Sequence, residues 1–272
     1  MIARTARLAG LAAALTAAVT LAGCGAGATG LSSTSASPHG AAPSPTDSRT
    51  PLQILESSIP DEKSLVYHFS VKGADLPMTG VIDSTRKTAV VEFSYHNASP
   101  SFTTSMTVLL TAKKSWGKIT FTPALAGLPR MPKQWMLVDP QKVKDKTSPF
   151  LNAPESDPGL TNEVFDSASH VKQTGAGHFS GTTDLSLTND DILAAEQLKA
   201  LGSKAHALSF TATVDGQGRL TSAAVKVPAA GKFKAGTYQV TYDGYGHTRT
   251  PSLPAAADQT KATAAFYDFV NS

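Results

Sequence analysis

Alternation of inward and outward positions along much of the chain predicts short strands. Five runs follow a period of two, in which every second side chain is apolar or small and the intervening residues are mostly polar. This period is typical of strands that bury one face of a sheet. The inward positions are Leu65, Tyr67, Phe69 and Val71; Ala89, Val91, Phe93 and Tyr95; Thr104, Met106, Val108 and Leu110; Leu208, Phe210, Ala212 and Val214; and Tyr238, Val240 and Tyr242.

Turn and helix signals separate these runs. Residues 83–86 (Asp-Ser-Thr-Arg) and 215–218 (Asp-Gly-Gln-Gly) predict turns, the second a hairpin because Gly and Asp tolerate positive φ. Residues 188–191 resemble a capping box that opens an amphipathic helix. We expect a closing helix from Asp258 to Val270 and a short opening helix from Thr50 to Ser58. Many antiparallel strands with a few helices to cover them predict an α+β domain with a curved sheet.

The N-terminus has the pattern of an export signal. Arg4 and Arg7 precede an uncharged stretch of Ala, Leu, Val, Gly and Thr from Leu8 to Ala22. This stretch is shorter than the roughly 20 apolar residues that a membrane span needs. The sequence Leu-Ala-Gly-Cys, which ends at Cys24, resembles a lipobox, so we expect signal cleavage between Gly23 and Cys24.

Cys24 is the only cysteine of the chain, and this favours lipidation over a structural role. The alternative is a buried or accidental cysteine after an ordinary signal. Two or three acyl chains on Cys24, at about 0.8 kcal/mol per buried CH₂, would hold the protein firmly on a bilayer. We therefore expect a lipid-anchored protein on the outer, extracytoplasmic face of the cell membrane, without a disulfide to stabilise its core.

Composition divides the chain into three parts. Residues 1–23 form the predicted lipoprotein signal peptide. Residues 24–50 are rich in Ser, Thr, Ala, Pro and Gly and have almost no large apolar side chain, which predicts a flexible tether. Residues 51–272 then suit a single β-rich domain.

Charge and motifs exclude several function classes. The chain has 24 basic and 21 acidic residues, and no basic cluster interleaves with aromatic side chains, which argues against nucleic acid as a partner. The seven histidines show no helical i, i+4 pair and have no cysteine partner beyond Cys24, so we expect no metal site.

The sequence also shows no catalytic motif. Residues 177–181 (Gly-His-Phe-Ser-Gly) depart from the Gly-x-Ser-x-Gly nucleophile elbow. Asp190 and Asp191 are better explained as helix-start residues than as paired catalytic carboxylates. We expect no enzyme activity and no cofactor.

Six groups of residues form an ordered set along the chain, and each marks a strand, turn or helix rather than a reactive site. They are residues 134–139 (Gln-Trp-Met-Leu-Val-Asp), 171–175, 178–185, the helix 190–201, residues 210–215 with 218–220, and residues 242–246 (Tyr-Asp-Gly-Tyr-Gly). Together, and in this order, these segments resemble the LppX/LprG-type bacterial lipoproteins.

This resemblance implies a half-barrel related to the LolA/LolB lipoprotein carriers. In that fold an antiparallel sheet wraps around helices and leaves an apolar cavity. Members of the family bind acyl chains of lipids or lipoglycans and help to move them outward from the inner membrane. The resemblance thus implies that a lipid or glycolipid is the ligand.

The candidate ligand-binding residues come from two segments. One is the predicted strand around Val108, and the other is the Pro- and Met-rich segment 123–140, which we interpret as the lip of a cavity. An alternative is that Trp135 and Leu137 simply pack into the core from an edge strand. The candidates are Met106, Val108, Leu110, Met131, Trp135 and Leu137.

Two function hypotheses follow. The first is a lipoprotein that binds, and in the fuller form transfers, lipid acyl chains without covalent chemistry. The second is an envelope lipoprotein that acts as a protein-interaction or sensor module. An apolar cavity of several hundred Å³ favours the first, and a filled core with an exposed apolar patch favours the second.

Overall fold

The computed structural model describes residues 48–74, 77–151, 154–188 and 192–272. The chain divides into two units, Met1–Thr46 and Asp47–Ser272, and every described residue belongs to the second. The predicted signal peptide, Cys24 and the tether up to residue 47 lie outside the described residues, as do Asp190 and Asp191.

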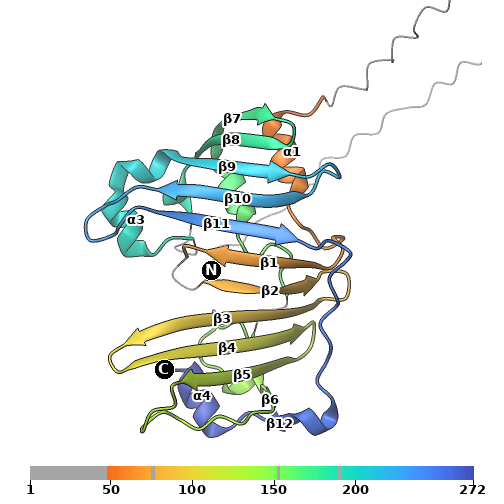
Figure 1. Cartoon of the computed structure of the whole chain (residues 1–272), viewed down its shortest axis with the longest axis vertical. Helices are drawn as coiled ribbons and strands as arrows, with labels where there is room; N and C mark the ends of the chain where they lie inside the picture. The colour runs from red at the N-terminus through yellow and green to blue at the C-terminus, as the bar shows by residue number, and fades with distance from the viewer. Residues whose placement is uncertain (1–47, 75–76, 152–153, 189–191) are drawn as a thin grey trace, which may run out of the picture. The chain divides into compact units, whose positions relative to one another are not determined.

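A single sheet of twelve strands dominates the described residues. Its order is β12-β6-β5-β4-β3-β2-β1-β11-β10-β9-β8-β7 (Figure 1). The strands are β1 Tyr67–Lys72, β2 Met78–Asp83, β3 Thr88–Ala98, β4 Ser101–Thr111, β5 Ser115–Thr122, β6 Trp135–Leu137, β7 Ala168–Gly175, β8 His178–Thr183, β9 Leu208–Val214, β10 Leu220–Val227, β11 Gly236–Asp243 and β12 Gln259–Lys261.

Every pairing in this sheet is antiparallel except the parallel pair of β12 and β6. The sheet is curved and does not close, so β7 and β12 remain as its two edges. The α+β class with a curved antiparallel sheet is thereby confirmed, and the architecture is compatible with a half-barrel.

The five runs of period-two alternation lie in strands β1, β3, β4, β9 and β11, as predicted. In β1 the side chains of Tyr67, Phe69 and Val71 are buried, while His68 and Ser70 between them are partly exposed. Two expected inward positions are wrong, because Leu65 precedes β1 and is 59% exposed, and Tyr95 near the end of β3 is 36% exposed. We call the face that carries the buried side chains of β1 the inner face of the sheet, and the opposite face the outer face.

The helices of the described residues are short. The α-helices are α1 Pro51–Ser58, α2 Thr161–Asp166, α3 Ala195–Leu201 and α4 Ala264–Val270. The 3-10 helices are η1 Pro140–Lys142, η2 Leu185–Leu187, η3 Gly202–Ala207 and η4 Ala256–Asp258. The opening helix is confirmed, and Thr50 caps it in a reciprocal capping box with Gln53.

Two helix boundaries in the sequence prediction are wrong. The closing helix begins at Ala264 rather than Asp258, because residues 259–261 pair with β6 as strand β12 and Thr263 caps the helix. Helix α3 begins at Ala195, after an N-cap residue, Ala194, that makes no side-chain cap. The hydroxyl of Thr188 donates instead to the carbonyl of Leu185, so it opens no helix.

The main core lies on the inner face. Buried side chains of α1, α2 and α4 join those of the strands in one cluster, so these helices all cover the same face. Leu55, Phe165 and Phe266 are the fully buried contributions of the three helices. Because an open sheet has no second sheet to close over it, helices and loops must supply the cover for this apolar face.

Part of the outer face is also covered. Register places Val81, Val90, Leu109, Trp116 and Leu137 in one row across five strands, on the face opposite Val108. Leu109 and Trp116 are buried, although they do not belong to the main core cluster. The segment 244–258, which runs from β11 to β12 (Figure 1), lies here, since the side chain of Gln259 links the indole Nε1 of Trp116 to the carbonyl of Pro254.

Asp83 fastens this segment, which we call the strap, to the β2–β3 turn. Its carboxylate accepts hydrogen bonds from Thr250 Oγ1 at 2.6 Å, Thr85 Oγ1 at 2.7 Å and Arg86 Nη1 at 2.9 Å. Burial by itself raises the pKa of Asp83, but the bonds from Thr250, Thr85 and Arg86 outweigh it and lower the pKa to about 2.

The substitution Asp83→Asn tests the strap. The native pKa lies below the ordinary value, so the contribution of Asp83 to stability is complete above about pH 4 and is lost as the pH falls towards 2. We expect Asp83→Asn to lower the free energy of unfolding at pH 7 by about 1–3 kcal/mol and to flatten its pH dependence below pH 4. Urea denaturation followed by circular dichroism measures both effects. Asp243→Asn, at an exposed carboxylate, is the control, and an equal loss in the two variants would refute this role of Asp83.

Candidate functional site

The inner face is divided into a filled half and a partly open half. Over β1, β9, β10 and β11 it is filled by large side chains with almost no exposed surface. These include Tyr67, Phe69, Phe165, Phe210 and Tyr242. Such dense aromatic packing leaves this half to structure rather than to a ligand.

Residues 154–160, which we call the inner loop, lie against this filled half. The hydroxyl of Tyr67 on β1 donates to the carbonyl of Ser156, and that of Tyr238 on β11 donates to the carbonyl of Gly159 at 2.7 Å. A Cβ atom at Gly159 would come within 2.4 Å of Val240, so only glycine allows this close approach. Two adjacent strands thus hold a polar loop against the core by satisfying its backbone.

Asp157 is the ionisable centre of the inner loop. Its carboxylate accepts hydrogen bonds from the hydroxyls of Tyr242 and Thr161 and from the backbone N–H of Asn162. Burial raises the pKa of Asp157, and the three hydrogen bonds act in the opposite direction without cancelling it. Burial and the neighbouring Asp157 also raise the pKa of Tyr242. These groups are engaged with each other, and their hydrogen bonds fix the loop.

The half of the inner face over β2–β5 remains partly open. Phe102 on β4 contacts Phe121 on β5 with ring centroids 6.0 Å apart, and Phe121 contacts Phe269 of α4 at 5.5 Å. Six large apolar side chains here are only partly buried, although Phe93 and Ile119 beside Met106 are buried. We call this set the apolar strip; its members are Met78, Val91, Phe102, Met106, Phe121 and Phe269.

Four of the six predicted ligand residues lie on or beside this half. Met106, Val108 and Leu110 share the inner face of β4, as their spacing predicts. Val108 and Leu110 are buried in the packed core, whereas Met106 is partly exposed in the apolar strip. Met131 packs, partly buried, against the same core from the segment before β6. Of these residues, Met106 is the best placed to meet a ligand.

Trp135 and Leu137 lie on the other side of the sheet. Leu137 pairs with Trp116 on the outer face, and Met136 between the two candidates is the residue that enters the inner core. The Nζ atom of Lys118 lies 4.6 Å from the centroid of the Trp135 ring, a cation–π contact on the outer face. The predicted set is therefore not brought together at one site, and the ligand-binding role of each member stays a prediction.

The residues that the sequence reasoning missed are Phe102, Phe121 and Phe269. The alternation of Gly117, Ile119 and Phe121 in β5 was the available signal, since it matches the strand period used elsewhere. The contact of Phe269 with Phe121 could not be read from the chain, because it depends on how α4 packs on β5.

Other site classes find no support in the part of the chain that the structure describes. No cluster of three or more His, Cys, Asp or Glu side chains that could hold a metal ion occurs among these residues. None of the helices formed by them is long and apolar enough to cross a membrane. Cys24, the predicted lipidation site, stays a prediction from sequence.

No protein-family model matches the chain, and no curated protein matches it. The proposals below therefore depend on geometry and on the sequence motifs.

Two tyrosine variants test how the inner loop is held. Tyr242→Phe and Tyr238→Phe each remove one buried hydroxyl of β11, but the first leaves a buried carboxylate with one donor fewer. We expect Tyr242→Phe to lower the free energy of unfolding by about 2–3 kcal/mol at pH 7, and Tyr238→Phe by about 1 kcal/mol. Without its Tyr242 donor, Asp157 has a still higher pKa, so the loss in Tyr242→Phe shrinks as the pH falls. Urea denaturation at pH 7 and pH 4 checks this, and equal losses at both pH values would contradict it.

Proposed function

We propose that this chain is a lipid-anchored extracytoplasmic lipoprotein that binds acyl chains of a lipid or lipoglycan on the inner face of an open half-barrel. The observation that carries the proposal is the apolar strip. The strip is a set of partly exposed Phe, Met and Val side chains on the inner face of a curved sheet, with Phe269 of α4 beside it.

The composition of the strip suits a flexible hydrocarbon ligand. Phe102, Phe121 and Phe269 supply rigid apolar surface in edge-to-face contact, and Met78 and Met106 adapt to irregular shapes. An acyl chain of about 16 carbons gains roughly 10 kcal/mol from burial before the entropic costs of binding. No charged group is needed for this interaction, so the ligand is selected mainly by its tail.

Helix α4 forms one wall of the proposed site. It contributes Phe269 to the strip and Phe266 to the core, where the Phe266 ring contacts Phe150 at 5.3 Å. The Tyr267 hydroxyl, in the middle of the helix, accepts from the backbone N–H of Asp139 at 2.8 Å, and the side chain of Asn271 at the C-cap accepts from the backbone N–H of Lys144 at 2.8 Å.

The N-terminal motif supplies the cellular setting of the proposal. Lipidation at Cys24 would keep the domain on the outer face of the membrane, beside the pool of lipids from which it draws its ligand. The resemblance to the LppX/LprG-type lipoproteins supports lipid transfer as the role of such binding.

A second candidate function is a protein-interaction or sensor module. The filled half of the inner face favours it, since Tyr67, Phe69 and the inner loop leave only part of the half-barrel open. In that case the apolar strip would receive side chains of a partner protein instead of a lipid tail.

Native mass spectrometry of the polypeptide 47–272 after incubation with phospholipid vesicles tests lipid binding. We expect bound lipid at near one per chain. Met106→Glu should lower the bound fraction about tenfold or more, because a carboxylate in the strip would have to be desolvated by the acyl chain. Trp135→Ala, on the outer face, should bind as the unaltered chain does.

Circular dichroism first establishes that both variants fold. If the unaltered chain shows only the mass of the lipid-free protein after incubation, the lipid proposal is wrong and the protein-interaction module is favoured. Equal losses in Met106→Glu and Trp135→Ala would show that lipid binds elsewhere than in the apolar strip.

A further inference from the structure

The outer face of β7–β11 carries a groove that the lipid proposal does not use. Two adjoining hollows make it up, one of about 570 Å³ at the ends of β9, β10 and β11 and one of about 320 Å³ over β7, β8 and β9. Ser209 and Lys226 line both hollows, so they form one continuous surface feature. We call it the outer groove.

Strand register explains why this surface is hollow. On the outer face Thr237 of β11 pairs with Lys226 of β10, and Ser209 of β9 pairs with Thr182 of β8. The next row contains Ala224, Thr211, Ser180 and Lys172 in the same way, from β10 to β7. Most of these side chains are short. Serine and threonine hydroxyl groups therefore line the bottom of the groove, and the longer lysine side chains extend from it.

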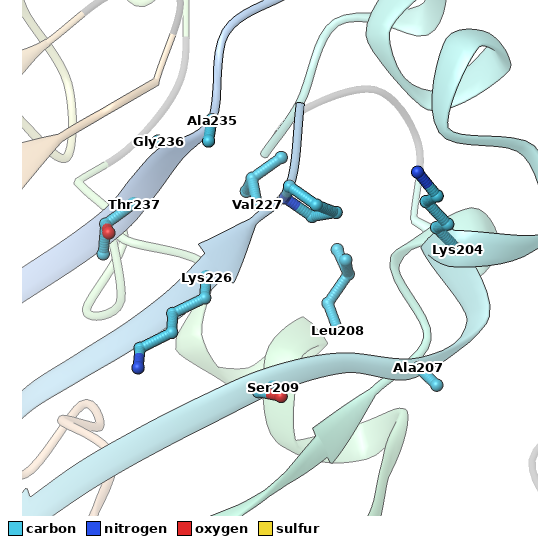
Figure 2. A pocket seen from close by; sticks show the side chains of 10 residues that line it. Lys204, Ala207, Leu208, Ser209, Lys226, Val227, Ala235, Gly236 and Thr237 are labelled. Atoms are coloured by element: carbon cyan, nitrogen blue, oxygen red, sulfur yellow. The ribbon is translucent and has the colours of Figure 1, made fainter. Parts of the chain in front are cut away.

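The charged groups of the outer groove are all basic. Lys204 and Lys226 line the larger hollow, and His170, Lys172 and Lys226 line the smaller one. No acidic side chain lines either hollow, and among the described residues none lies within ion-pair distance of Lys172, Lys204 or Lys226. Figure 2 shows Lys204 and Lys226 on opposite sides of Leu208 and Val227. The groove therefore has positive charge at separate points along it.

The spacing of these charges favours an extended ligand over a single small anion. Lys226 on β10 and Lys172 on β7 are three strands apart, which corresponds to about 14 Å at a strand separation of about 4.8 Å. One phosphate or sulfate ion cannot bridge this distance. A chain with repeated negative groups that crosses the strands can meet the lysines in turn and bond to the hydroxyls between them.

The chemistry of the lining selects among polyanions. Ammonium groups are point charges that suit phosphate without requiring a bidentate arrangement. The lining has no exposed Phe, Tyr or Trp side chain, because Phe210 is buried on the inner side, so large aromatic rings on which bases or sugar rings could stack are lacking there. Free hydroxyls at Ser180, Ser209 and Thr211 match a ligand that carries phosphate oxygens and hydroxyl groups.

We propose that the outer groove binds a linear phosphodiester polymer of the polyol phosphate type. The polymer crosses β10, β9, β8 and β7, with its phosphates at Lys226 and Lys172 and its polyol units over the serine and threonine hydroxyls. Because the outer groove and the apolar strip lie on opposite faces of the sheet, this binding is independent of the proposed lipid site. It gives the domain a second attachment within the cell envelope.

Isothermal titration calorimetry with poly(glycerol phosphate) tests the proposal on the polypeptide 47–272, which contains the whole described core. We expect binding that weakens as salt rises. Lys226→Glu and Lys172→Glu should each weaken it about tenfold or more. Lys113→Glu, in the exposed β4–β5 hairpin, makes the same change in net charge and should weaken it less than about twofold. Met106→Glu in the apolar strip should leave polymer binding unchanged, which separates this proposal from lipid binding.

Three outcomes would overturn the proposal. The first is no binding of the polymer at low salt, and the second is an equal effect of Lys113→Glu and Lys226→Glu, which would show a response to net charge alone. The third is binding of polyglutamate, or of anionic phospholipid vesicles, as tight as that of the polymer and with the same sensitivity to Lys226→Glu. That result would assign the groove to general anion binding or to a membrane surface.

Discussion

An open sheet has to be covered, and this requirement shapes the rest of the molecule. Twelve strands form one curved sheet without closing, so the apolar inner face must be shielded by other parts of the same chain. Helices α1 and α2 shield the half over β7–β9, the inner loop lies against β1 and β11, and α4 shields part of the half over β3–β5. The inner loop is polar, and it stays against an apolar surface because Tyr67, Tyr238 and Tyr242 reach it with their hydroxyls.

Because the two halves of the inner face are covered unequally, one half serves stability and the other can bind a ligand. In the filled half the tyrosine hydroxyls are bonded to the inner loop and the aromatic rings are packed together, so this half stabilises the fold. The other half keeps Met106 and Phe121 partly exposed beside a short helix, where an apolar ligand can add to the packing. The outer face is different again, since its short hydroxyl side chains and its lysines, which have no acidic partner among the described residues, favour polar, charged ligands.

Local pattern was sufficient to predict much of the fold. Alternation of residues 67–71 and 104–110 depends only on neighbouring positions, and both segments are strands with the expected inner faces. Helix ends were harder, because residues 259–261 take a strand conformation only when β6 is present to pair with them. The short helix α2 gave no clear periodic signal within its six residues.

The candidate site was predictable only in part, for a similar reason. The period of two showed that Trp135 and Leu137 share a face, but not which face, and Met136 is the residue that turns inward. The apolar strip joins Phe102, Phe121 and Phe269, which are brought together by long-range packing of α4. The inner loop likewise depends on tyrosines some 80 residues away in sequence or more.

The measurement that most directly tests the account is photo-crosslinking with a fatty acyl probe that carries a diazirine along its chain, followed by mapping of the adducts by mass spectrometry. The account predicts adducts on β3, β4, β5 and α4, at or beside Met106, Phe121 and Phe269, with none on the inner loop. Adducts confined to the outer face, or spread evenly over the surface, would contradict the division of the inner face into a filled half and a ligand-binding half.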